Sequence, residues 1–214
     1  MLILAYQYFE QYEPNIFQEL AKIFSKTAIE VCEGQQYDVD FEQQAQVSTD
    51  QYLKMIAYKT AVLVGAALQM GAIIAQTSEE NKQKIYNFGL ALGIAYQLQD
   101  DYLDTFGDAS FGKKIGGDIL QNKKTLLYLK ALEKGTPEQK QELLTLYSTE
   151  PKSEEEKITR VTEFFIATES HTFLRAQVEA YTLKAFAILD TLDIPEEKKN
   201  ILKEFGSSLM NRTI

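Results

Sequence analysis

The sequence contains few of the residues that build disulfides and transition-metal sites. Its 214 residues include one cysteine, Cys32, and one histidine, His171. A lone cysteine cannot form an intramolecular disulfide, which is typical of proteins from reducing compartments. One histidine and one cysteine are also too few for a multi-imidazole or thiolate site, and the Glu-x-x-His pair of di-iron bundles is missing. Because no charged and apolar leader opens the chain, we expect a cytoplasmic protein.

Basic residues are outnumbered by acidic ones. The 22 lysines and arginines stand against 31 aspartates and glutamates, a net charge of -9. This balance disfavours nucleic acids and anionic membranes as partners, because both attract clustered Lys and Arg. The longest apolar run, residues 61–75, is interrupted by Gln69 and is shorter than the roughly 20 residues that span a bilayer. We therefore expect no nucleic acid partner, no transmembrane segment and a buried helix at 61–75.

Proline and glycine are scarce, with four and eleven residues, and the apolar residues between them recur with helical period. Hydrophobic residues make up 45% of the chain and charged residues 25%, which is enough apolar material to fill a core. A length of 214 residues favours one domain, since domains typically have about 100 to 200 residues. The sequence therefore predicts an all-α protein.

Capping signals set the limits of the expected helices. Ser48 opens a capping-box signature, and residues 136–139 and 153–156 repeat it. Gly34 is a suitable stop for the first long helix, and the polar segment 35–47 after it is irregular. The expected helices cover residues 14–33, 48–75, 78–104, 125–134, 154–167, 170–189 and 196–211, and a further helix begins at 137.

Three aspartates share one turn of an otherwise apolar helix. Asp100 and Asp104 are four residues apart, and Asp101 lies three residues before Asp104. They lie near the helix C-terminus, where the macrodipole disfavours anions, and each like-charge neighbour costs about 0.2 to 0.5 kcal/mol on an exposed helix. An acidic, solvated helix end is the structural alternative. The apolar faces of this helix instead favour acids that project into a cavity and bind a cation.

Lysines follow the acidic turn within a glycine-containing segment. Lys113 and Lys114 precede Gly116-Gly117-Asp118, and Lys123 and Lys124 come after it. Magnesium binds one or two protein carboxylates together with substrate phosphates, and lysines supply charge to the remaining phosphate oxygens. The alternation of acids and bases therefore predicts Mg2+ and a diphosphate as ligands.

A second basic pair, Lys59-Thr60, directly precedes the apolar run. On its own this pair is weak, because a lysine before a buried segment usually extends to the surface. We interpret His171 as a residue at the start of a helix. The sequence has no P-loop, dinucleotide glycine fingerprint or nucleophile elbow, so nucleotide-dependent and acyl-transfer chemistry are disfavoured.

Together these segments resemble the trans-isoprenyl diphosphate synthases, the polyprenyl synthetases that include farnesyl and geranylgeranyl diphosphate synthases. Residues 96–104, Tyr-Gln-Leu-Gln-Asp-Asp-Tyr-Leu-Asp, are similar to the second aspartate-rich motif of that family. Residues 112–118 and 122–125 are similar to its basic loop. Three shorter matches extend the resemblance over essentially the whole chain: Lys59-Thr60, the expected turn at Gly34-Gln35, and the terminal Leu209-Met210-Asn211-Arg212.

The resemblance implies an all-α isoprenoid-synthase bundle, a single domain over residues 1–214 that is usually homodimeric. Its helices would surround a deep apolar cavity with three magnesium ions at the mouth. Asp100 would bind magnesium directly, with Asp101 and Asp104 acting directly or through water. The allylic diphosphate would be contacted by Lys59, Lys114 and Lys123.

The resemblance also implies a reaction. Thr60, Gln97 and backbone carbonyls near Lys59 would face the allylic carbon as positive charge develops there. Magnesium and lysines would stabilise the departing diphosphate, and the double bond of isopentenyl diphosphate would attack the allylic cation. A proton would then be lost, with the released diphosphate as its expected acceptor.

One family feature is missing from the sequence. The family carries a first D-D-x-x-D followed by an arginine pair, and neither occurs here. The three arginines are all isolated: Arg160, Arg175 and Arg212. Residues 190–193 have D-x-x-D spacing, but their place beside Pro195 predicts a turn, and Asp38 falls in the polar segment. We therefore expect an N-terminally truncated bundle, the carboxyl-terminal part of a synthase.

Several functions are compatible with this interpretation. The main one is a short-chain prenyltransferase, and the alternative is a non-catalytic helical partner of a complete synthase or an inactive fragment. A terpene cyclase of the same fold fits less well, because the basic segments belong to chain-elongating members. Product length cannot be read from these residues. We expect the chain alone to be inactive in condensation and to expose apolar surface at 1–8 and 61–75.

Overall fold

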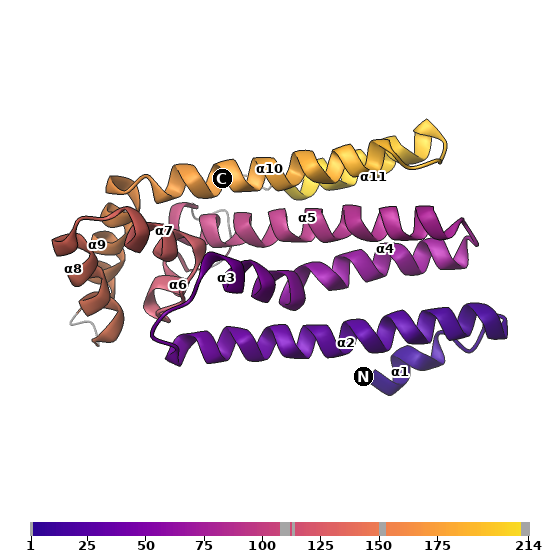
Figure 1. Cartoon of the computed structure of the whole chain (residues 1–214), viewed down its shortest axis with the longest axis horizontal. Helices are drawn as coiled ribbons and strands as arrows, with labels where there is room; N and C mark the ends of the chain where they lie inside the picture. Colours follow the sequence, from indigo (N-terminus) through magenta and orange to yellow (C-terminus); the bar gives the residue numbers. More distant parts are fainter. Residues whose placement is uncertain (1, 108–111, 113, 150–152, 211–214) are drawn as a thin grey trace.

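Helices make up all the regular secondary structure in the part of the chain that the computed structural model describes, residues 2–107, 112, 114–149 and 153–210 (Figure 1). The predicted all-α class is therefore confirmed. The helices are α1 (Leu2–Gln7), α2 (Pro14–Gln43), α3 (Thr49–Ile56), the π-helix η1 (Ala57–Ala61), α4 (Val62–Ile74), α5 (Glu79–Phe106), α6 (Gly117–Leu120), α7 (Leu126–Lys134), α8 (Pro137–Ser148), α9 (Glu154–Ala167), α10 (Ser170–Asp190) and α11 (Glu196–Met210).

The predicted capping residues begin several of these helices. Ser48 and Thr136 form complete capping boxes at the starts of α3 and α8, with both reciprocal hydrogen bonds present. The side chains of Ser78 and Ser153 accept hydrogen bonds from backbone amides at the starts of α5 and α9. These contacts span three residues, so local sequence was sufficient to predict them.

The prediction that α2 stops at Gly34 was wrong. The helix continues through Gly34 to Gln43, which includes most of the segment expected to be irregular. Gly34 is buried inside the helix, and a Cβ at this position would lie 2.2 Å from the backbone nitrogen of Lys59. The glycine therefore permits a close approach between two helices and does not end one of them.

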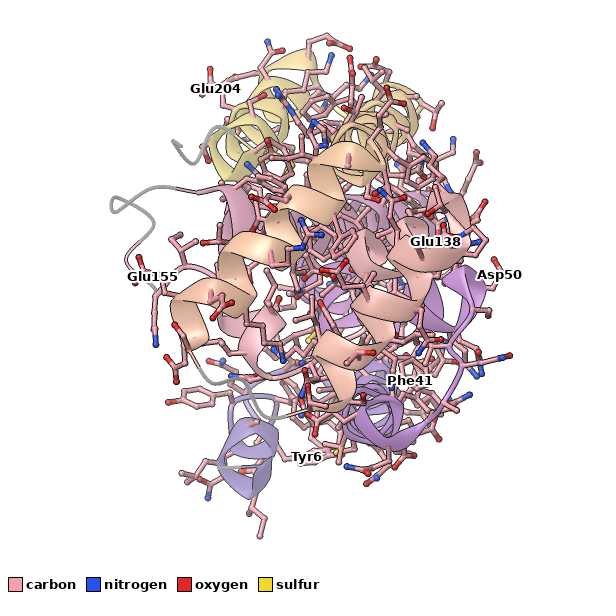
Figure 2. All side chains as sticks on the ribbon, turned by 90° about the vertical axis from the view of Figure 1, so that its left-hand side faces the viewer. Tyr6, Phe41, Asp50, Glu138, Glu155 and Glu204 are labelled. Carbon is pink, nitrogen blue, oxygen red and sulfur yellow. The ribbon has the colours of Figure 1, made fainter. Side chains whose placement is uncertain are left out.

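The long helices lie side by side in layers. In Figure 1, α5 runs between α4 on one side and α10 on the other, α2 lies beyond α4, and α11 returns along α10. Both flanks of α5 are buried, and Phe88, Leu92 and Leu98 have no exposed surface. The short helices α6 to α9 gather at the end of the molecule where α5 ends. Figure 2 views the molecule from this end.

The helix that begins at Thr49 changes its winding at η1. There the amide of Val62 bonds to the carbonyl of Ala57, five residues earlier. This widened turn carries Lys59 and Thr60. It packs against α2 and α5, and the contact on each side is made at a glycine, Gly34 of α2 and Gly93 of α5. A Cβ on Gly93 of α5 would lie 2.6 Å from the Cα of Ala61, on the side opposite the Gly34 contact. π-turns are frequent at functional sites, so η1 is a natural place to search for one.

The continuous segment Thr49–Ile74 is the one helix in the described chain that is long and apolar enough to cross a membrane, by length and composition alone. This is weak support for a span, since core helices of soluble proteins have the same properties. Only 33% of its most apolar stretch is buried. The expectation of a buried helix is thus correct for one face, whereas Leu63 and Ile74 on the other face are 56% and 39% exposed.

Candidate functional site

A cavity of about 590 Å³ opens where α2, α3 and α5 end and α6 begins. Phe41, labelled in Figure 2 at the C-terminal end of α2, lies in its wall. The charged and polar lining comes from four segments of the chain, at residues 38–42, 52–59, 97–104 and 114–125. It includes Asp38, Tyr52, Lys59, Gln97, Asp100, Asp101, Asp104, Lys114, Asp118, Lys123 and Lys124.

The three aspartates of the acidic turn all line this cavity, but they have different surroundings. Asp101 is 5% exposed, and its two carboxylate oxygens accept hydrogen bonds from the Tyr52 hydroxyl and from Gln97 Nε2, the latter at 2.9 Å. Burial is the main reason that its pKa rises to about 7, and the nearby charge of Asp118 adds to this rise. The hydrogen bonds from Tyr52 and Gln97 act in the opposite direction.

Asp104 connects the acidic turn to the segment that carries the lysines. Its Oδ2 accepts a hydrogen bond from the amide of Asp118 at 2.9 Å, and its carbonyl accepts one from the amide of Gly116 at 2.6 Å. The pKa of Asp104 is raised to about 6, mainly by burial and also by the nearby Asp118 carboxylate. A bound cation would relieve this crowding, because it favours the charged form of both groups.

Two of the predicted substrate lysines are paired with acids in the cavity wall. Lys59 Nζ lies 2.5 Å from Asp38 Oδ2, and Lys123 Nζ lies 2.7 Å from Asp118 Oδ1. Burial alone would lower the pKa of Lys123, but its contact with Asp118 raises the pKa above the usual value. A carboxylate therefore holds each of these two lysine side chains in place in the cavity wall.

Lys114 and Lys124 differ from that pair. Lys114 lines the cavity rim, where its exposed side chain reaches Glu154 on α9 at 2.5 Å. Lys124 Nζ donates to the backbone carbonyls of Phe41 and Gln44 at 2.6 Å each, and so caps the C-terminus of α2. The structure thus gives Lys124 a mainly architectural contact.

Thr60 and Gln97 are hydrogen-bonded to each other. The Thr60 hydroxyl donates to Gln97 Oε1 at 2.9 Å, and Gln97 in turn donates to Asp101. These contacts join η1 to α5 across 37 residues of sequence. All eight predicted site residues lie among the described residues, and seven of them line the cavity directly. Thr60 reaches the cavity through Gln97.

The side chains fit magnesium better than a softer metal. Within the described ranges, no group of three or more His, Cys, Asp or Glu side chains is arranged to hold a metal ion on its own. Asp100 and Asp104 lie one turn apart on a helix in the cavity wall, so they offer hard oxygen donors. Magnesium commonly takes one or two carboxylates and completes its shell with water and substrate phosphates. The donor set is compatible with that mode.

Three residues of the cavity are not among the residues predicted for the site, namely Asp38, Tyr52 and Asp118. The predicted helix end at Gly34 puts Asp38 in a polar turn, and the sequence pattern marks Asp118 only as a neighbour of glycines. Tyr52 precedes Lys59 by seven residues, which places both on one face of a helix, and this spacing could have identified it. Asp38 could not be identified, because the helix that carries it was predicted to end at Gly34.

Two other features of the sequence lie at the ends of α10. His171 lies in the first turn of α10 with its ring centroid 5.7 Å from that of Phe106, so its interpretation as a helix-start residue is confirmed. The D-x-x-D at 190–193 ends α10 in a turn, as predicted, and the amide of Asp193 bonds to Asn81. Lys113 and the terminal Asn211-Arg212 lie outside the described residues.

Comparisons with known proteins identify relatives of this chain. A family model described as polyprenyl synthetase matches residues 1–164. A geranylgeranyl pyrophosphate synthase of Geoglobus acetivorans is 31% identical over 198 residues, which is 92% of this chain and 59% of that protein. A geranylgeranyl diphosphate synthase of Saccharolobus solfataricus is 33% identical over 88% of this chain and 56% of its own length. The chain thus spans less than two thirds of these curated relatives.

Solved structures give the same result for the fold. A crystal structure of a geranylgeranyl pyrophosphate synthase has a TM-score of 0.93 and 46% identity, over 99% of this chain and 66% of that one. A geranylgeranyl pyrophosphate synthetase from Pyrococcus horikoshii has a TM-score of 0.88 and 26% identity, over 97% and 63% of the two chains. These proteins contain the helical arrangement described above together with a further third of chain.

Proposed function

The chain belongs to the polyprenyl synthetase family, and we propose that it acts in trans-prenyl transfer, the condensation of isopentenyl diphosphate with an allylic diphosphate. The observation that carries this proposal is the cavity in which an acidic turn, two Lys–Asp pairs and the Thr60–Gln97 contact come together. A homodimeric state and a cytoplasmic location belong to the same proposal.

In this proposal Lys59 and Lys123 bind the allylic diphosphate. Their side chains are about 30% exposed, and the incoming phosphate oxygens replace Asp38 and Asp118 as partners of the two lysines or share the lysines with them. Lys114 lies at the rim with a well-exposed side chain, and it can turn from Glu154 toward the same phosphates. The lysines orient the diphosphate so that its allylic end points into the cavity.

Asp100 and Asp104 would hold Mg2+, with Asp101 next to them. When bound, the metal supplies positive charge that stabilises the departing diphosphate. Asp104 also accepts hydrogen bonds from two backbone amides of the turn at Gly116–Asp118, one on its side chain and one on its carbonyl, and these contacts join the acidic turn to the segment that carries Lys123.

Thr60 and Gln97 act on the carbon skeleton. Their oxygen atoms lie between η1 and α5, and positive charge that develops at the allylic carbon is stabilised by such fixed dipoles. The double bond of isopentenyl diphosphate then forms the new carbon–carbon bond with the allylic carbon, whose bond to the diphosphate has broken. The released diphosphate accepts the proton that leaves the adjacent carbon. None of these steps requires a histidine or a cysteine from the chain.

Calorimetry tests the binding part of this proposal. A non-hydrolysable bisphosphonate titrated into the chain with Mg2+ should release heat that disappears with EDTA. Asp100→Ala should weaken the binding by at least about tenfold, since groups at metal sites commonly contribute 10-fold to 100-fold to affinity. Asp50→Ala, on an exposed residue of α3, is the matched control and should bind as the unmodified chain does. Equal binding with and without Mg2+ would end the metal-site proposal.

The chain alone should not condense isopentenyl diphosphate with geranyl diphosphate at a useful rate. One acidic cluster can organise only part of a three-magnesium arrangement, and the first aspartate-rich motif and its arginine pair do not occur in the sequence. The assay uses labelled isopentenyl diphosphate, with a complete relative such as the Geoglobus acetivorans enzyme as positive control. Comparable turnover by both proteins would show that the second motif suffices.

A second candidate function is a helical partner subunit of a complete synthase. It is favoured by apolar side chains that remain exposed on α1 and α4, namely Ile3 at 79%, Leu4 at 55% and Leu63 at 56%. Co-expression with a complete synthase distinguishes the two functions. A partner subunit should co-purify and change the kinetics of the synthase even when Asp100→Ala has removed metal binding, whereas a transferase requires that aspartate.

A further inference from the structure

Tyr52 is the least expected member of the site. It lies on α3, 49 residues before the acidic turn, and only 1% of its surface is exposed. Its hydroxyl donates to Asp101 Oδ2 in the buried wall of the cavity. A buried phenol needs a hydrogen-bond partner, but many partners would satisfy it. The choice of a carboxylate from the acidic turn therefore calls for an explanation beyond packing.

Asp101 differs from the two aspartates beside it. Successive residues of an α-helix are turned by about 100°, so Asp100 and Asp104 share a face and Asp101 points away from Asp100. Each Asp101 oxygen already accepts a hydrogen bond from a protein side chain, Tyr52 on one side and Gln97 on the other. These contacts turn the Asp101 carboxylate toward α3 and Gln97.

The chemistry of Asp101 dictates how Gln97 is oriented. An ionised carboxylate only accepts hydrogen bonds, so it holds the NH2 group of Gln97 directed toward Asp101, as the contact at 2.9 Å shows. Its carbonyl oxygen then points the other way, where it accepts the Thr60 hydroxyl at 2.9 Å. Each donation in this chain runs toward Asp101. The Thr60 hydroxyl has only one hydrogen, and because that hydrogen is used, its lone pairs are the part left to face other groups.

We propose that Tyr52 is a positioning residue that holds Asp101, so that Asp101 orients Gln97 and, through it, Thr60. Asp101 accepts the hydrogen bonds at the end of this chain, and Asp100 and Asp104 are the aspartates that bind the metal. The inference rests on the proposed function for its consequence, which is that oxygen atoms and not N–H groups face a developing allylic cation. Without Asp101, Gln97 is free to turn over and present its NH2 group.

Side-chain amide NMR of Gln97 tests the positioning without any substrate. The Gln97→Glu variant removes the resonance pair and so assigns it. Tyr52→Phe should shift the Gln97 NH2 resonances, and Tyr128→Phe, which removes a hydroxyl buried in the same core cluster, should leave them in place. Equal spectra for Tyr52→Phe and the unmodified chain would overturn the proposal. If Tyr52→Phe does not fold, the Gln97 resonances of Asp101→Asn decide in the same way.

Binding of Mg2+ and inorganic pyrophosphate separates the positioning role from a ligand role. Asp101→Asn should keep the affinity within about threefold, while Asp100→Asn should lose at least about tenfold, the scale expected at a metal site. An equal loss in both variants would make Asp101 a ligand and overturn the proposal. Absence of binding by the unmodified chain would instead overturn the proposed function, and the amide measurement would still decide whether Tyr52 positions Gln97.

Discussion

Gly34 on α2 and Lys59 on η1 meet backbone to backbone. A Cβ on Gly34 would come within 2.2 Å of the Lys59 nitrogen and 2.6 Å of the Tyr58 carbonyl carbon, both far inside van der Waals contact. Asp38 lies one turn further along α2 and pairs with the Lys59 side chain at 2.5 Å. The glycine therefore sets the distance at which the acid and the lysine can meet.

Gly34→Ala should destabilise the chain. The added methyl group meets backbone atoms, which cannot rotate away, and overpacking of this kind typically costs about 1 to 3 kcal/mol. In a chain of this size each kcal/mol lowers Tm by roughly 2 to 4 °C. Gly71→Ala is the matched control, since a Cβ there meets nothing within 4 Å, and it should keep or raise Tm because alanine favours helix. Thermal melts of both variants test this prediction. An unchanged Tm for Gly34→Ala would contradict the close contact.

Asp38→Asn should strengthen the binding of Mg2+ and pyrophosphate. The Asp38 carboxylate competes with phosphate for the Lys59 ammonium, so its removal frees the lysine, and we expect a gain of about threefold to tenfold. Lys59→Met keeps the aliphatic stem and should lose about tenfold, which corresponds to roughly 1.4 kcal/mol. Lys26→Met, on an exposed lysine of α2, should change nothing. Weaker binding by Asp38→Asn would assign that carboxylate to the metal or to the fold.

Substitutions of the adjacent residues Lys123 and Lys124 should affect different properties, pyrophosphate binding for Lys123 and stability for Lys124. Lys124→Met removes the ammonium that caps the carbonyls of Phe41 and Gln44, so it should lower stability by about 1 to 2 kcal/mol. Lys123→Met should mainly weaken pyrophosphate binding. Calorimetry and chemical denaturation of both variants test this division. The opposite pattern would show that Lys124 turns from its cap to the ligand.

The stability of the chain without ligand should fall as the pH rises from 5 to 8. An ordinary aspartate has a pKa near 3.9 when unfolded, whereas the folded protein has pKa values of about 7 for Asp101 and about 6 for Asp104. Between these values the folded chain keeps protons that the unfolded chain has released. The stabilisation is therefore complete below the unfolded pKa of about 3.9, and it is lost progressively as the pH rises through 6 and 7.

The pH effect can be assigned to a residue. Asp101→Asn should flatten the dependence of Tm on pH between 5 and 8, with the Asp101 contribution on the order of a few kcal/mol across this window. Glu80 and Glu142 have lowered pKa values because of ion pairs with Lys84 and Arg160. These two residues therefore change the free energy of unfolding only below about pH 4.5, outside the range from 5 to 8. A Tm that rises between pH 5 and 8 would contradict the raised pKa values.

The sequence alone was sufficient for features that depend on neighbours a few residues apart. The capping boxes at Ser48 and Thr136 each close over three residues, and the starts of α5, α8 and α9 follow from such signals. The shared face of Asp100 and Asp104 follows from helix geometry. The contacts that form these features join residues within one turn of the same helix.

The tertiary structure decided the features whose partners are distant in the chain. Gly34 has the local pattern of a helix stop, but the helix continues because burial against η1 outweighs the low helix propensity of glycine. Asp38 becomes a site residue only because α2 continues to Gln43 and brings it to Lys59, 21 residues away. Local propensity differs by about 1 kcal/mol per residue, a scale that packing readily exceeds.

The different contacts of the aspartates in the acidic turn also depend on the tertiary structure. The sequence placed three carboxylates together, and helix geometry turned Asp101 away from Asp100. Only the packing of α3 against α5 placed Tyr52 beside Asp101, across 49 residues. A buried carboxylate requires partners, and which residues supply them depends on which helices meet. Composition and spacing could therefore predict the chemical character of the site, whereas the contacts of each carboxylate were determined by the fold.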